Sequence, residues 1–111
     1  MEKERGNNGN TLSSNRDKKI FQSERLIIRE YSKLARNVMN RLSELRVAEC
    51  LADIPNTPPP RRHKLTNNYE GCWGIDVSKN HRIVIEPYGE FDVNDLTTIR
   101  EIKILKVEDY H

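Results

Sequence analysis

The sequence has no long apolar run, few aromatic residues and only two cysteines. No uninterrupted apolar run exceeds three residues, whereas a signal peptide or a membrane span needs a far longer one. We therefore expect a cytoplasmic protein that does not enter a membrane. Aromatic residues make up only 6% of the chain, so its core should consist mainly of Leu, Ile and Val.

The cysteines and histidines show no metal-binding pattern. Cys50 and Cys72 lie twenty-two residues apart and form no Cys-x-x-Cys pair, and His63, His81 and His111 have no recognised ligand spacing. The chain also lacks a glycine-rich phosphate loop and a serine nucleophile elbow. We expect two buried thiols, no disulfide, no metal and no other cofactor.

The charges are unevenly distributed, although the net charge is only +2. Residues 1–82 contain sixteen Lys and Arg against ten Asp and Glu, which gives +6. Residues 83–111 contain three against seven, which gives −4. A basic region of this kind can attract a polyanion such as nucleic acid, with an affinity that falls as salt rises. An ordinary solvated surface is the alternative interpretation.

The 111 residues are enough for one domain, preceded by a polar arm. Residues 1–15 contain a single Leu as their only apolar residue after the initiator, so we predict a flexible arm or an irregular edge strand. Apolar residues then recur at helical spacing as far as Leu45, and Ser14 or Asn15 could cap the first helix. Because this stretch is too long for one globular helix, we expect a break at Ser32 and a hairpin of two helices.

A proline-rich segment separates the helical region from the second half of the chain. Three consecutive prolines, Pro58–Pro60, cannot donate backbone hydrogen bonds and favour extended geometry, so we expect residues 53–60 to form an extended connection. The cations Arg61, Arg62 and Lys64 follow at once and surround His63, a residue type that exchanges protons near neutral pH. This cluster is suited to binding an anion.

Three later segments have the patterns of strands. Alternation of large apolar residues predicts a half-buried strand at 72–77, and residues 78–81 have the composition of a turn. Residues 82–86 are apolar on both faces, so this strand should be central. Residues 99–110 predict a long strand with Ile102 and Ile104 on one side and Leu105 and Val107 on the other. The predicted fold class is α+β, with an N-terminal helical hairpin packed on a small, mainly antiparallel sheet of three to four strands.

Six short strings follow one another between residues 41 and 111. They are, in chain order, Arg-Leu-Ser-Glu-Leu (41–45), Leu-Ala-Asp-Ile-Pro (51–55), Pro-Pro-Pro-Arg-Arg-His-Lys-Leu (58–65), Gly-Cys-Trp-Gly-Ile-Asp-Val (71–77), Asn-His-Arg-Ile (80–83) and Val-Glu-Asp-Tyr-His (107–111). In this order they resemble the HigB branch of the RelE/ParE superfamily of bacterial type II toxins. The resemblance covers residues 18–111 and implies a RelE-like toxin domain over residues 16–111. It also implies a ribosome-dependent endonuclease that cleaves mRNA, uses the RNA 2′-hydroxyl as nucleophile and is neutralised by a cognate helix-turn-helix (HigA-like) antitoxin.

The same resemblance implies roles for particular residues. His63 matches the histidine of an Arg-x-His-x-Leu motif and is the candidate proton-transfer group, while Arg82 would hold the scissile phosphate. Tyr110 would stack on a base or donate a hydrogen bond, and His111 would be the second proton-transfer group. The predicted RNA-binding residues are Arg61, Arg62 and Lys64. Neighbouring residues in an extended segment point to opposite sides, so Lys64 and His63 should not face one phosphate together.

Two departures from the family pattern remove positive charge. Residues 67–71 contain no cation where many relatives have a basic loop, and Thr66 stands where some relatives have a lysine. Two alternatives therefore remain open from the sequence. One is a ParE-like toxin that acts on DNA gyrase without cleaving RNA, and the other is a degenerate, non-toxic relative. The terminal Tyr110 and His111 count against the ParE-like alternative, because that branch generally lacks this terminal pattern.

Overall fold

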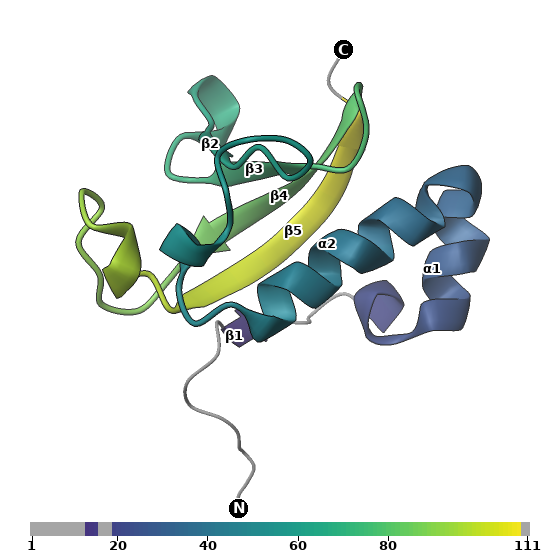
Figure 1. Ribbon diagram of the computed structural model, residues 1–111, viewed down its shortest axis with the longest axis horizontal. Helices are drawn as coiled ribbons and strands as arrows, with labels where there is room; N and C mark the ends of the chain where they lie inside the picture. Colours follow the sequence, from purple (N-terminus) through teal and green to yellow (C-terminus); the bar gives the residue numbers. More distant parts are fainter. Residues whose placement is uncertain (1–12, 16–18, 110–111) are drawn as a thin grey trace, which may run out of the picture.

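The computed structural model describes residues 13–15 and 19–109, which form two layers. Helices α1 (Glu24–Tyr31) and α2 (Ala35–Val47) lie together against one face of a five-stranded sheet (Figure 1). The strands are β1 (Ser13–Asn15), β2 (His63–Lys64), β3 (Trp73–Asp76), β4 (His81–Pro87) and β5 (Glu101–Asp109). The predicted α+β class and the helical hairpin are confirmed. In this part of the chain, no helix is long and apolar enough to cross a membrane.

The break between the two helices lies where the sequence predicts it. Ser32 ends α1 with a positive φ of 48°, and a short 3-10 turn from Ser32 to Leu34 leads into α2. The start of the helical region differs from the prediction. Ser14 and Asn15 are paired with β5 as part of β1, and α1 is instead capped by Ser23, whose hydroxyl accepts a hydrogen bond from the Leu26 N–H at 3.3 Å.

The sheet has the strand order β1-β5-β4-β3-β2. Strands β2 to β5 are antiparallel to their neighbours, and β1 runs parallel to β5 at the edge. The antiparallel part therefore has the predicted number of strands, and β4 is central as expected. The short β1 coincides with the end of the predicted arm or irregular edge strand, and residues 1–12 lie outside the described residues.

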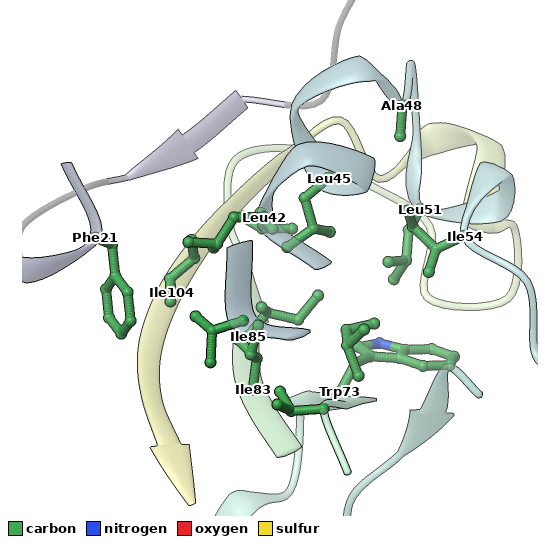
Figure 2. Packing of buried hydrophobic residues seen from close by; sticks show 14 of the residues in the cluster. Phe21, Leu42, Leu45, Ala48, Leu51, Ile54, Trp73, Ile83, Ile85 and Ile104 are labelled. Atoms are coloured by element: carbon green, nitrogen blue, oxygen red, sulfur yellow. The ribbon is translucent and has the colours of Figure 1, made fainter. Parts of the chain in front are cut away.

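The two faces of the sheet are packed very differently. On the helix side, Ile83 and Ile85 of β4 join α2 and β3 in a large apolar cluster (Figure 2). Complete burial of each such side chain stabilises the fold by about 1.5–3 kcal/mol. On the opposite face, Val84 belongs to a second, smaller cluster with Leu65 and Cys72. Among the described residues no α-helix packs on this second face, and we refer to it as the open face (Figure 1).

A β-bulge in β5 determines which side chains reach the open face. Val84 pairs with Lys106 and Ile85 with Ile104, so Leu105 is an additional residue between two paired positions. Without it, Lys106 would continue the period-two row of Ile104 and face the core. The bulge also returns Val107 to the helix side, where it packs against the large cluster, so the predicted common side for Leu105 and Val107 is wrong.

The proline-rich segment is folded rather than extended. Leu51–Asp53 forms a 3-10 turn, and the Arg61 N–H donates to the Thr57 carbonyl at 3.0 Å across Pro58–Pro60. The predicted extended connection over residues 53–60 is therefore wrong. A hydrogen-bonded turn needs only one donor and one acceptor at its ends, so prolines inside it can lack an N–H without breaking a hydrogen bond of the turn. The turn closed by Arg61 lies immediately before β2.

Candidate functional site

A cleft on the open face contains residues of the predicted site. It has a volume of about 290 Å³ and is lined by residues 63–69 of β2 and the following loop, together with Arg82 of β4. This volume is at the lower limit for pockets that enclose a small molecule, roughly 300 Å³. The cleft is better suited to one segment of a longer ligand that continues along the surface.

The imidazole of His63 has a defined orientation in this cleft. Its Nδ1 lies 2.7 Å from the backbone oxygen of Arg61. A carbonyl oxygen can only accept, so Nδ1 must donate, and in the neutral ring Nε2 is then the atom that can accept a proton. Among the described residues no side chain bonds to Nε2. His63 therefore has the tautomer that a general base requires.

Gly74 provides the space for this ring. It pairs with His63 across β2 and β3, and a Cβ atom at position 74 would lie 3.0 Å from both Cε1 and Nε2 of the imidazole. Any larger residue in this strand position would push the ring away. Glycine within a strand commonly marks such a close approach, so the sequence contained a signal for this contact.

Arg82 is held by a carboxylate on the neighbouring strand. Its Nε and Nη2 donate to the same oxygen, Oε2 of Glu108, at 3.0 and 2.6 Å. Arg82 and Glu108 pair directly across β4 and β5, and their side chains are only 16% and 14% exposed. Charge-assisted bonds of this length are strong, so the guanidinium is firmly positioned at the rim of the cleft.

Tyr69 and Lys106 extend this pair into a network of four side chains. Lys106 Nζ lies 3.1 Å from the Tyr69 hydroxyl and 3.9 Å from Oε1 of Glu108. Burial acts to raise the pKa of Glu108, but hydrogen bonds from Tyr69 and Arg82 and the charges of Arg82 and Lys106 outweigh it and lower that pKa. Glu108 is therefore a carboxylate at neutral pH.

The remaining predicted cations are placed around β2. The Arg61 guanidinium bonds to both carboxylate oxygens of Asp76, at 2.5 and 3.3 Å. Arg62 donates to the Ile54 carbonyl at 2.7 Å and stacks 5.5 Å from the Trp73 ring centre. Both side chains thus support the fold locally, a role that sequence analysis did not predict. Their binding to RNA stays a prediction.

Lys64 and the two terminal residues complete the predicted set. Lys64 is exposed and pairs with Trp73, whereas His63 pairs with Gly74, so the two neighbours are directed to opposite sides as their spacing suggests. Tyr110 and His111 lie outside the described residues. His63 and Arg82 line one cleft, and the roles proposed for Tyr110 and His111 there remain predictions.

Sequence analysis missed Tyr69, Lys106 and Glu108. Lys106 brings a cation to Tyr69, beside the loop where Thr66 and residues 67–71 have none. Nothing in a single sequence indicates the bulge that turns Lys106 and Glu108 outward. The described ranges 13–15 and 19–109 contain no group of three or more His, Cys, Asp and Glu side chains that could hold a metal ion.

Comparison with known proteins relates this chain to toxins at the level of fold. No protein-family model and no curated protein matches it. The solved YoeB/ParE toxin from Agrobacterium tumefaciens is similar, with a TM-score of 0.52 and 10% identity over 91% of this chain and 99% of that chain. A chain of the YoeB-YefM complex from Staphylococcus aureus has a TM-score of 0.49 and 17% identity, over 89% of this chain and 93% of that chain. The first of these two matches shows that the chain shares the fold of the Agrobacterium toxin.

Proposed function

We propose that this chain is the toxin of a bacterial type II toxin–antitoxin pair and cleaves mRNA on the ribosome as a metal-independent endoribonuclease. The single observation that carries the proposal is the placement of His63 and Arg82 in one cleft, where Nδ1 of His63 lies 2.7 Å from the Arg61 carbonyl oxygen. The fold shared with the Agrobacterium toxin supports it. The motif resemblance to HigB-type toxins adds the ribosome, the mRNA substrate and a helix-turn-helix antitoxin as partners.

The proposed reaction is attack of a 2′-hydroxyl on the adjacent phosphorus atom. Nε2 of His63 accepts the hydroxyl proton while the new O–P bond forms. Arg82 stabilises the additional negative charge of the phosphorane through its guanidinium. The bond from phosphorus to the 5′-oxygen then breaks, and this oxygen takes a proton. The products are a 2′,3′-cyclic phosphate and a free 5′-hydroxyl.

The terminal residues and the basic residues have separate proposed tasks. His111 donates the proton to the leaving 5′-oxygen, and Tyr110 stacks on a base near the cleaved bond. Lys64 is exposed on the edge strand β2 and attracts the RNA backbone. Arg61 and Arg62 contribute positive potential from their positions beside His63.

Expression in bacteria tests this function. The wild-type chain should arrest growth and produce new 5′ ends in cellular mRNA, whereas Arg82→Ala and His111→Ala variants should permit ordinary growth. Arg36→Ala is the matched control, because it removes an exposed arginine of α2 rather than one of the cleft. Growth arrest by the His111→Ala variant equal to that of the wild type would remove the role assigned to His111.

A second candidate function is inhibition of DNA gyrase without RNA cleavage. It is favoured by one observation, since the similar Agrobacterium protein is named as both a YoeB and a ParE toxin. Gyrase supercoiling and ribosome-bound mRNA cleavage, measured side by side with the same purified protein, separate the two functions. Absence of both activities and of growth arrest would identify a non-toxic relative.

A further inference from the structure

The network of Arg82, Glu108, Tyr69 and Lys106 places an anion of the chain itself at the proposed phosphate-binding residue. Oε2 of Glu108 accepts from both Nε and Nη2 of Arg82, at 3.0 and 2.6 Å. A phosphate oxygen recognised by arginine uses the same donors of the planar guanidinium. These two donors cannot keep their bonds to Glu108 and also bind a substrate phosphate in this way.

We propose that Glu108 occupies the phosphate position of Arg82 and moves toward Lys106 when a phosphodiester of single-stranded RNA binds. This inference rests on the proposed function, because it assumes that Arg82 binds the RNA. Beyond that function, it assigns to Glu108 a role in limiting RNA affinity and to Lys106 the role of binding the displaced carboxylate.

The surroundings of Glu108 are suited to such an exchange. Its other oxygen, Oε1, is already 3.9 Å from Nζ of Lys106, and the Lys106 side chain is 48% exposed. Tyr69 bonds to Lys106 at 3.1 Å and so holds this cation beside Glu108. A small rotation of the Glu108 side chain therefore exchanges one cation for another without leaving the carboxylate unpaired, which would be costly at a site of low exposure.

The charges also balance for one phosphodiester. Arg82 and Lys106 carry two positive charges and Glu108 one negative charge, so the group has a net charge of +1. One bound phosphodiester neutralises it. Without the carboxylate the same group would carry +2, and its attraction for RNA would be stronger.

The test measures binding of a short single-stranded RNA whose 2′-O-methyl groups prevent cleavage. The Glu108→Gln variant should bind it roughly five- to tenfold more tightly than the wild type at low salt. Its slope of log affinity against log salt should be steeper by about 0.7, the value for one additional phosphate contact on a single strand. Glu86→Gln is the matched control, because Glu86 is an exposed carboxylate of β4 whose side chain alternates to the same face as Arg82.

A double variant assigns the gain to Arg82. Arg82→Ala should weaken RNA binding, and Arg82→Ala combined with Glu108→Gln should show no gain over Arg82→Ala alone. The inference is overturned if Glu108→Gln binds RNA equally or more weakly, if Glu86→Gln gains as much, or if the gain persists without Arg82. Should Arg82→Ala leave binding unchanged, the proposed function itself loses its phosphate-binding residue.

A measurement on the unmodified chain keeps the inference testable if a variant fails to fold. The Arg82 Nε–H resonance in a ¹⁵N NMR spectrum reports its bond to the Glu108 carboxylate. Addition of the 2′-O-methyl RNA should shift this resonance in a saturable manner, together with the Lys106 side-chain resonances. Saturation of RNA binding with an unchanged Arg82 resonance would contradict the exchange.

Discussion

The helix side and the open face of the sheet use the same strands for different purposes. In β4, Ile83 and Ile85 are fully buried against the helices, while Arg82 and Val84 face the other way. The helix side is continuous and apolar (Figure 2). The open face has only a small apolar cluster beside charged groups. We therefore expect stability to depend mainly on the helix side, whereas the proposed chemistry belongs to the open face.

One residue in β5 links the two faces. The additional Leu105 reverses the side of every following residue, so Lys106 and Glu108 lie with Arg82 instead of in the core. A regular strand would have buried both charges under the helices. The difference between the faces thus depends on register as well as on composition.

The largest effect on stability should come from the helix side. Ile85→Ala removes a fully buried side chain from the main cluster and should lower the free energy of unfolding by about 2–5 kcal/mol. Leu65→Ala on the open face should fall near the lower end of this range, because its cluster is smaller and can relax. Urea unfolding curves measure both. Equal losses would contradict the division of roles between the faces.

Gly74→Ala should reduce activity strongly but change stability little. The new Cβ would lie 3.0 Å from the His63 ring and 3.1 Å from Cδ2 of Leu65, so the imidazole must shift. We expect RNA cleavage to fall roughly 10- to 100-fold, or about 1.4–2.7 kcal/mol in activation free energy. The unfolding midpoint should change little. Cys72→Ala, on the same face but outside the His63 contact, is the control, and full activity of Gly74→Ala would contradict the assigned position of His63.

The smallest effect is a pH-dependent contribution of Glu108 to stability. Its pKa is lowered from 4.5, so its ionised form stabilises the fold above that pH, and the contribution is lost as pH falls through the lower folded value. Glu108→Gln should lower the free energy of unfolding by about 0.5–1.5 kcal/mol at pH 7, because the neutral amide still accepts a hydrogen bond but has lost the charge. The difference from the wild type should shrink below pH 4.5. A difference that stays constant in acid would show that the charge of Glu108 does not matter.

Much of the fold follows from local patterns in the sequence. The break at Ser32 follows from the length of the stretch with helical periodicity, which exceeds that of one globular helix. The central position of β4 follows from Ile83–Ile85, which make both faces of this strand apolar. These signals are local, so a single chain is sufficient to reveal them. The helix start was misjudged because Ser14 and Asn15 satisfy their backbone groups by pairing with distant β5. Tertiary pairing of this kind leaves no mark in the residues themselves.

The site was predictable only in part for the same reason. His63 and Arg82 are named by motif resemblance, and Gly74 is a recognisable exception within a strand. The positions of Glu108 and Lys106 cannot be predicted without the bulge at Leu105. A regular alternation of sides along β5 would place both residues on the helix side instead of the open face. The contacts of Arg61 and Arg62 with Asp76 and Trp73 likewise depend on a turn that the proline run does not specify.

Cleavage of ribosome-bound mRNA with a single modified nucleotide tests the central claim most directly. The purified chain should cleave the unmodified mRNA and leave a 2′,3′-cyclic phosphate, and it should not cleave when the nucleotide before the scissile bond carries a 2′-O-methyl group. His63→Ala should reduce cleavage of the unmodified mRNA roughly 10²- to 10⁴-fold. Cleavage of the 2′-O-methylated site, or wild-type rates with His63→Ala, would contradict the account.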